Sequence, residues 1–162
     1  MTKALINNTV INISAREADF NVGEEYAALV SDNPRDGAVV TFTGRVREFN
    51  QGSQVSSLIL EHYPAMTEKA LQDIAEQACE RWNLSRIIII HRVGKLDLCD
   101  QIVFVGTTSP HREDAFQGAQ FLMDYLKTRA PFWKKEATPA GERWVEALEK
   151  DKTAEARWGQ EE

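Results

Sequence analysis

The chain has 162 residues, of which 43% are hydrophobic and 27% are charged, and its formal net charge at pH 7 is −6. This size and balance are typical of one folded domain and exclude a largely disordered chain. The acidic charge argues against a general nucleic-acid binder, which needs a basic surface for phosphates. The longest apolar run is too short to span a membrane and no export signal is apparent, so we expect a cytoplasmic protein.

The two cysteines, Cys79 and Cys99, are far apart and belong to no Cys-x-x-Cys or Cys/His cluster. This spacing indicates neither a disulfide framework nor a zinc site. Cys99 also has acidic neighbours, which would raise the pKa of its thiol and weaken it as a nucleophile. We therefore expect reduced cysteines, no bound metal and no cofactor.

The first half of the chain predicts alternating elements. We expect residues 1–20 to form a loosely attached extension that includes an apolar, strand-like stretch at 10–13. Residues 22–30 have the apolar spacing of a helix and are followed by turn residues. The β-branched segment 38–43 predicts a strand that ends at glycine and leads into a polar loop at 48–54.

The middle of the chain predicts three more strands and a helix. Residues 58–63 are expected to form a strand, and the proline at 64 starts a helix whose apolar stripe continues to Trp82. Segments 86–93 and 101–108 are rich in β-branched residues and are joined by a short link. This spacing predicts a β-hairpin.

A second amphipathic helix is predicted after residue 108. Ser109 has the character of an N-cap and Pro110 that of a first helical residue, while Pro131 ends the pattern. Residues 21–148 then form the expected domain, followed by a charged tail at 149–162. The apolar anchors of the C-terminal part are Trp144, Val145, Leu148 and Trp158. Mixed helices and strands with at least one hairpin favour the α+β class.

One segment departs from the acidic character of the chain. Residues 125–135 hold four basic side chains and no acid, which are Lys127, Arg129, Lys134 and Lys135. A local excess of positive charge predicts a pocket for a small anionic ligand. Lys134 follows Pro-Phe-Trp, where desolvation would lower its pKa toward the range that acid/base lysines need. Lys127 has an alternative explanation, because the dipole of a last helical turn favours lysine.

His111 and Arg112 are expected in the first turn of the second helix, where free backbone N–H groups and the helix dipole attract anions. Together they could hold a phosphate group. The alternative is that Glu113 and Asp114 neutralise them on a solvated surface.

Arg45 and Arg47 flank Val46 just after a predicted strand, so alternation places both guanidinium groups on one face. They are candidates for ligand binding at a strand end, and the alternative is an ordinary charged strand end. His62 and His91 are interpreted as structural residues because both lie in apolar strands.

Three segments read DGAVVTFTGRVR at 36–47, LEHYP followed by MTEKAL within 60–71, and MDYLKTRAPFWK at 123–134. Together they resemble a known protein family, the large, catalytic subunit of molybdopterin synthase. The resemblance extends from about Asn21 to about Leu148 in unbroken order. The first twenty residues and the last dozen lie outside it.

This resemblance implies an α/β hammerhead fold with an additional antiparallel β-rich subdomain, and a homodimer within a heterotetramer. Each copy would bind a small ubiquitin-like sulfur carrier whose C-terminal Gly-Gly thiocarboxylate donates its sulfur to cyclic pyranopterin monophosphate, and two such transfers would be needed. The product would be the dithiolene of molybdopterin. By resemblance, the catalytic residues are Lys127 and Lys134, and the substrate pocket is lined by Arg45, Val46, Arg47, Lys134, Lys135 and Glu136, with His111 and Arg112 from the second protomer.

Two other functions are compatible with the residues. The basic segment could dock an acidic partner without catalysis. Alternatively, Lys127 or Lys134 could form a Schiff base with pyridoxal phosphate, with His111 and Arg112 on its phosphate. The small size of the chain argues against the second of these.

Overall fold

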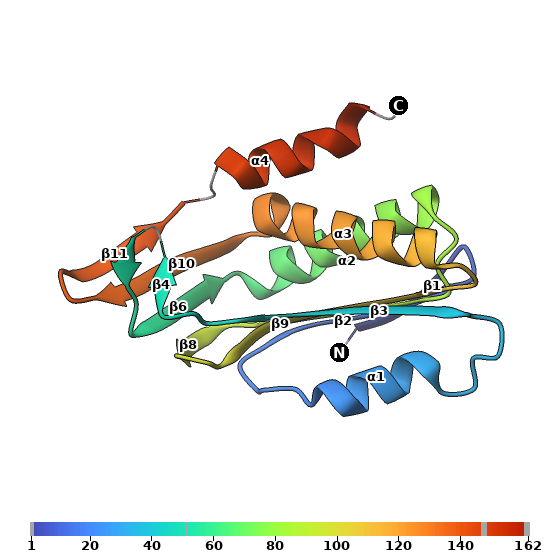
Figure 1. The fold of residues 1–162 in the computed structure, drawn as a ribbon, viewed down its shortest axis with the longest axis horizontal. Helices are drawn as coiled ribbons and strands as arrows, with labels where there is room; N and C mark the ends of the chain where they lie inside the picture. Colours follow the sequence, from blue (N-terminus) through green and yellow to red (C-terminus); the bar gives the residue numbers. More distant parts are fainter. Residues whose placement is uncertain (1, 51, 147–148, 161–162) are drawn as a thin grey trace.

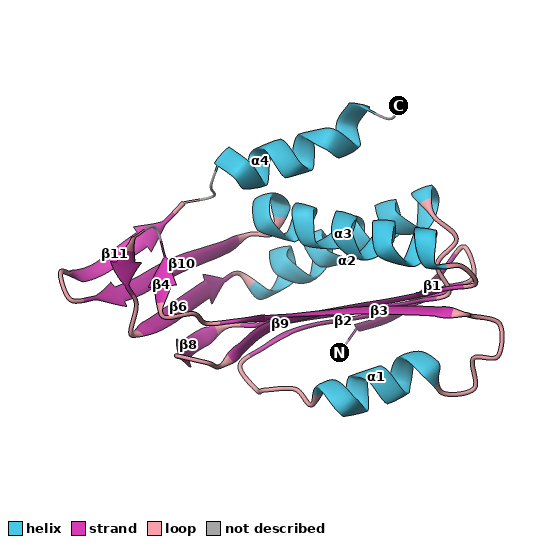
Figure 2. Cartoon of the chain, in the orientation of Figure 1, coloured by secondary structure: helices cyan, strands magenta, loops and turns pink. Residues whose placement is uncertain are grey.

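The computed structural model describes residues 2–50, 52–146 and 149–160, which form a mixed α+β fold. A five-stranded sheet has helices on both faces, and a four-stranded sheet extends from one end of it (Figure 1). Helices cover one end of the molecule, and the other end is made of strands (Figure 2). The predicted α+β class with an additional antiparallel sheet is therefore confirmed.

The larger sheet has the order β1 (Thr2–Ile6), β2 (Thr9–Arg16), β7 (Arg86–Arg92), β9 (Gln101–Ser109) and β3 (Ala38–Arg45). Strands β2 and β7 are parallel, and all other neighbours are antiparallel. The antiparallel pairing of β7 with β9 confirms the predicted hairpin, although the link between them contains a further strand, β8 (Gly94–Asp97).

The run of four isoleucines in β7 lies at the centre of the molecule. Ile87 and Ile89 belong to the core beneath α2 (Pro64–Arg81) and α3 (Arg112–Arg129). Ile88 and Ile90 belong to the core on the other face, which α1 (Val22–Val30) covers. Because successive strand residues point to opposite faces, a strand buried on both sides needs apolar residues at every position.

The interpretation of residues 1–20 as a loosely attached extension is wrong. Strand β2 lies inside the larger sheet between β1 and β7, and its side chains Ile11 and Ile13 are 0% and 1% exposed. The sequence pattern could not show this, because the partner strand of β2 lies more than seventy residues further along the chain.

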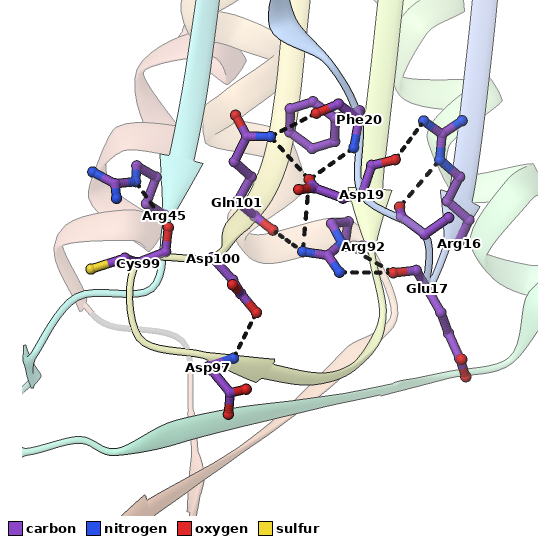
Figure 3. A network of polar contacts seen from close by, with 11 residues as sticks. Arg16, Glu17, Asp19, Phe20, Arg45, Arg92, Asp97, Cys99, Asp100 and Gln101 are labelled. Carbon is purple, nitrogen blue, oxygen red and sulfur yellow. Dashed lines mark hydrogen bonds and ion pairs between the residues drawn. The ribbon is translucent and has the colours of Figure 1, made fainter.

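A polar network closes the end of the larger sheet that adjoins the second sheet (Figure 3). The Arg92 guanidinium donates to the backbone oxygens of Glu17, at 3.0 and 3.1 Å, and of Gln101, at 3.0 Å. The Gln101 amide in turn donates to Asp19 Oδ1 and Phe20 O. These bonds tie the segment after β2 to the ends of β7 and β9.

The second sheet is antiparallel throughout, with the order β11 (Gly141–Val145), β10 (Phe132–Thr138), β6 (Ser57–His62) and β8. Its small core contains Val46, Leu58, Leu60 and Leu96. The segment expected as a loop holds a short hairpin of β4 (Phe49–Asn50) and β5 (Ser53–Gln54). This hairpin lies beside β10 and β11, which it contacts through side-chain hydrogen bonds.

Helix α3 begins later than its sequence predicts. Ser109 is the last residue of β9, and its hydroxyl donates to the Asn83 carbonyl at 2.7 Å, so it does not cap the helix. His111 occupies the N-cap position and the helix starts at Arg112. The predicted end is confirmed, since Ala130 before Pro131 is extended.

The C-terminal segment forms α4 (Glu149–Ala156) and the short 3-10 helix η1 (Arg157–Gln160). Trp158 is 5% exposed, its indole N–H donates to Asp124 Oδ2 at 2.8 Å, and its carbonyl accepts from Arg81 at 2.7 Å. The anchor role of Trp158 is confirmed. Trp144 is 57% exposed and is not an anchor, and Leu148 lies outside the described residues.

None of the helices in the described part of the chain is long and apolar enough to cross a membrane.

The central position of β2 predicts a large effect of truncating it. We expect Ile13→Ala to lower the free energy of unfolding by about 2–5 kcal/mol, because it leaves a cavity in a packed core. Urea denaturation followed by circular dichroism measures this loss. The matched control is Leu5→Ala on neighbouring β1, where the side chain is 69% exposed and the change should stay within about 0.5 kcal/mol. Equal effects of the two variants would contradict the burial of β2.

Candidate active site

A cavity of about 430 Å³ lies between the end of α3, the second sheet and the start of α4. Five cationic side chains line it: Arg45, Arg47, Lys127, Lys134 and Lys150. Three carboxylates also contribute, those of Glu136, Glu146 and Asp151. Of the four basic residues at 125–135, Lys127 and Lys134 thus line a cavity with an excess of positive charge.

The break at Pro131 brings the two candidate catalytic lysines together. Lys127 lies in the last turn of α3, and β10 begins immediately after the break and carries Lys134. The two side chains line the same cavity, and the positive charge of Lys127 is close enough to lower the pKa of Lys134. On a continuous helix, residues seven apart would share a face but lie about 10 Å apart along the axis.

Lys134 is the more buried of the two lysines, and its pKa is lowered to about 8. Removal of the ammonium group from water is the largest cause, and the positive charge of Lys127 is the next. Asp151 and Glu136 act in the opposite direction. A lysine with this pKa exchanges a proton readily near neutral pH, as general acid/base catalysis requires.

Arg45, Val46 and Arg47 lie where their alternation predicted. All three line the cavity; both arginines are exposed, while Val46 is 6% exposed and also packs into the core of the second sheet. The Arg45 guanidinium donates to the Cys99 carbonyl at 3.1 Å (Figure 3). Arg47 donates to Asn50 Oδ1 at 3.1 Å, which links it to the β4–β5 hairpin.

Glu136 is buried at the wall of the cavity and is held by a residue that sequence reasoning missed. Arg143 on β11 donates to Glu136 Oε2 from Nε at 3.1 Å and from Nη2 at 3.0 Å. The same guanidinium reaches Asn50 O at 2.8 Å, and the Asn50 amide donates to the other oxygen of Glu136. The pair therefore fixes the β4–β5 hairpin against the cavity. Only the register of β10 with β11 reveals that Arg143 lies opposite Glu136.

Lys135 does not join the other candidate residues at the cavity in this chain. It pairs with Glu142 at 2.7 Å and lies over the ring of Trp144. Alternation along β10 is the reason, because it places Lys134 and Glu136 on one face and Lys135 on the other.

His111 and Arg112 lie at the opposite end of α3 from Lys127. Fifteen residues of helix separate Arg112 from Lys127, which corresponds to about 22 Å along the axis. Both side chains are exposed, and neither lines the cavity. One pyridoxal phosphate cannot bridge the lysines and this helix start within a single chain, so the geometry argues against the Schiff-base alternative.

A second, smaller cavity of about 330 Å³ reaches the two lysines from the side of the larger sheet. Its walls include Phe42, Gly44, His91 and Met123, and it shares Lys127 and Lys134 with the first cavity. The lysines therefore stand where two cavities meet. His91 was interpreted from sequence as a structural residue, and no sequence signal places it beside the lysines.

The C-terminal helix α4 contributes Lys150 and Asp151 to the larger cavity. Sequence reasoning missed both, because they lie in the segment expected as a charged tail. An ion pair between Arg129 and Glu155 and the burial of Trp158 hold this helix against α3. The position of α4 thus depends on contacts that only the folded chain makes.

Neither cysteine lines either cavity. Cys79 is buried in the core, and burial raises the pKa of its thiol, whereas Cys99 is exposed in the turn after β8. The described residues contain no group of three or more His, Cys, Asp or Glu side chains arranged to hold a metal ion. The chemistry that this arrangement supports best is proton transfer and anion stabilisation by lysines.

Comparison with known proteins identifies the family. Residues 15–129 match the family described as MoaE protein. A relative from Escherichia coli (strain K12), named molybdopterin synthase catalytic subunit, is 61% identical over 139 residues, which cover 86% of this chain and 92% of the relative. The chain belongs to the MoaE protein family.

Solved structures of MoaE proteins share the fold. The molybdopterin biosynthesis MoaE protein from Burkholderia ambifaria MC40-6 is 51% identical and has a TM-score of 0.78, covering 92% of this chain and 98% of that one. A molybdopterin synthase structure from Staphylococcus aureus is 31% identical with a TM-score of 0.72, covering 86% of this chain and 97% of that one. The resemblance noted in the sequence is therefore confirmed at the level of family and fold.

The proximity of the two lysines predicts how Lys134 titrates. Because the Lys127 charge lowers the pKa of Lys134, we expect Lys127→Gln to raise that pKa above its value of about 8. The pH dependence of acylation of Lys134, measured by mass spectrometry of its peptide, gives the midpoint. Lys127→Arg keeps the charge and should leave the midpoint near that of the wild type. A midpoint that does not respond to Lys127→Gln would contradict the electrostatic coupling.

The Glu136–Arg143 pair predicts a stability effect. We expect Arg143→Ala to destabilise the fold by roughly 1–3 kcal/mol, because the carboxylate of Glu136 stays buried without its main donor. Lys135→Ala is the control on the same strand pair. Its ion pair with Glu142 is exposed, so its removal should change the unfolding free energy by less than about 1 kcal/mol. Thermal or urea denaturation distinguishes the two, and equal losses would contradict the assigned network.

Proposed function

We propose that this protein is the catalytic subunit of a molybdopterin synthase, a sulfurtransferase of molybdenum cofactor biosynthesis. It converts cyclic pyranopterin monophosphate to molybdopterin in two successive transfers, each of one sulfur from the C-terminal thiocarboxylate of a small ubiquitin-like carrier. The observation that carries this proposal is the meeting of Lys127 and Lys134 at a cationic cavity in which no cysteine takes part. Membership of the MoaE protein family and the name of the Escherichia coli relative support it.

The larger cavity suits the substrate in size and charge. A volume of about 430 Å³ is within the range of small-molecule sites. Arg45 and Arg47 at its rim offer guanidinium groups, which bind phosphate oxygens in a bidentate manner. Glu136 is held by Arg143, so its negative charge is offset inside the protein.

The two lysines act on the sulfur donor and on the oxygen that sulfur displaces. A thiocarboxylate is an anion, and a neighbouring ammonium group stabilises it. Lys127 is the main catalytic lysine beside the thiocarboxylate. Lys134, whose pKa is lowered to about 8, assists in positioning the substrate and delivers a proton to the oxygen on which charge accumulates. The sulfur comes with the carrier, so neither Cys79 nor Cys99 takes part.

The smaller cavity gives the carrier tail a second approach to the lysines. Its wall includes Gly44, where an added Cβ would lie 2.7 Å from Val103 Cγ1, so glycine is needed there for the close packing of β3 on β9 that shapes this wall. Two reactants can thus reach the same ammonium groups from two sides. The assembly is a heterotetramer of two copies of this chain and two carriers.

His111, Arg112 and Lys135 are assigned to substrate binding within this assembly. The first two lie far from the lysines of their own chain, at the start of α3. In the homodimer they reach the substrate pocket of the other protomer. The reaction takes place in the cytoplasm, in keeping with the two unpaired cysteines, and needs no bound metal or cofactor.

Reconstitution tests the activity. The protein is mixed with a thiocarboxylated ubiquitin-like carrier and cyclic pyranopterin monophosphate, and molybdopterin is detected by mass spectrometry. We expect product with the wild type and about a 10²–10⁴-fold lower rate with Lys127→Ala, the range typical of a lost acid/base group.

The Cys79→Ser, Cys99→Ser double variant is the control and should retain the wild-type rate. Loss of activity in this variant while it stays folded would contradict the transfer of sulfur directly from the carrier. Carrier binding without turnover by the wild type would show an interaction module in place of an enzyme.

A further inference from the structure

His91 on β7 has a fixed position beside the proposed active site. Its side chain is 6% exposed, and its ring stacks on Phe132 with centroids 3.8 Å apart and an interplanar angle of 17°. Nδ1 lies 2.9 Å from the carbonyl oxygen of Arg92. Two independent contacts thus determine both the plane of the ring and its rotation.

The contact with Arg92 also determines the tautomer. A carbonyl oxygen only accepts hydrogen bonds, so Nδ1 carries the hydrogen and the lone pair of the neutral ring is on Nε2. The Arg92 backbone is held in place by its own guanidinium, which donates to the carbonyls of Glu17 and Gln101 (Figure 3). The network at the end of the larger sheet therefore orients the imidazole.

His91 lines the smaller cavity together with Lys127 and Lys134. Burial lowers the pKa of His91 to about 3, and the positive charges of the two lysines act in the same direction. The ring is therefore neutral near pH 7, and its free nitrogen can accept a hydrogen bond in a cavity whose walls also include the two lysines.

We propose that His91 is a positioning residue of the sulfur-transfer site, whose unprotonated Nε2 accepts a hydrogen bond from the Lys127–Lys134 pair and holds it for the substrate. This inference rests on the proposed function. A buried ammonium group needs acceptors, and a neutral imidazole supplies one without a negative charge that would compete with the thiocarboxylate or the phosphate. His91 acts through the lysines and does not itself exchange protons with the substrate.

Other charged groups near the lysines also affect the protonation of Lys134. Glu136 on β10 and Asp151 on α4 favour the protonated form of Lys134, while Lys127 opposes it. His62 on β6 also stacks on Phe132, with ring centroids 6.2 Å apart, and lines neither cavity, although its charge acts with those of the lysines in lowering the pKa of His91. His62 is therefore a matched control, a histidine that contacts the same phenylalanine but not the cavities.

The test compares substitutions of His91 that separate stacking from hydrogen bonding. His91→Phe keeps an aromatic ring against Phe132 and removes the acceptor. His91→Asn keeps a donor for the Arg92 carbonyl but is too short to place an acceptor at the position of Nε2, so it serves if the first variant does not fold. His91→Gln places an amide oxygen near the former Nε2. His62→Phe is the control.

Two readouts are measured on the full chain. The first is the pKa of Lys134 from the pH dependence of its acylation, with no substrate present. We expect His91→Phe and His91→Asn to lower this pKa by about one to two units, because a charge-assisted hydrogen bond to the ammonium is lost. His91→Gln should restore it in part, and His62→Phe should leave it unchanged.

The second readout is steady-state turnover with thiocarboxylated carrier and cyclic pyranopterin monophosphate. We expect His91→Phe and His91→Asn to lower kcat about tenfold or more, because the lysine pair loses the hydrogen bond that holds it in position for the substrate. KM for the pterin should stay within about twofold, since His91 is not assigned to substrate binding. His91→Gln should recover part of kcat.

An unchanged Lys134 titration in folded His91→Phe or His91→Asn would overturn the proposal, even if activity fell. Equal loss of kcat in the Gln, Asn and Phe variants would also overturn the proposal, because it would show that His91 contributes to the site only through packing. Absence of turnover by the wild type would contradict the proposed function, while the Lys134 titration would still decide whether His91 holds the lysines.

Discussion

The break between α3 and β10 is the constraint on which the site depends. Proline at 131 cannot continue the helix and forces Ala130 into extended geometry, so the chain leaves α3 and enters the second sheet within two residues. Lys127 before the break and Lys134 after it then meet at the junction of the two sheets. The same turn places Phe132 against His91, which connects the larger sheet to the smaller one.

Two ammonium groups meet at this junction, that of half-buried Lys134 and that of exposed Lys127, and their charges repel each other. The pKa of Lys134 falls to about 8, mainly because of burial and then because of Lys127. Carboxylates from β10 and α4 limit the decrease, and Arg143 holds one of them in place. The result is a lysine pair that can hold an anion and still release a proton near neutral pH. A site of this kind suits sulfur transfer from a carrier thiocarboxylate without a cysteine nucleophile.

Much of the fold could be predicted from local pattern. The isoleucine run of β7, the turn before β3 and the apolar stripes of α2 and α3 are strong signals, because periodicity and turn residues reflect burial directly. The predicted start of α3 was wrong because the Ser109 hydroxyl does not cap the helix. It donates instead to the carbonyl of Asn83, a residue distant in sequence. The prediction that residues 1–20 form a loose extension was wrong for a similar reason, because β2 is stabilised by pairing with β7, which lies far along the chain.

The sequence by itself determined the excess of positive charge at 125–135, the helix break at Pro131, the alternation of Arg45 and Arg47, and the family through long ordered segments. Only the tertiary structure decided that Lys135 turns away from the cavity, that α4 supplies Lys150 and Asp151, and that Arg143 supports Glu136. It also placed His91 beside the lysines. The physical reason is that charge, periodicity and chain breaks are local properties, whereas strand register and the desolvation of a side chain depend on segments that meet only in the folded protein.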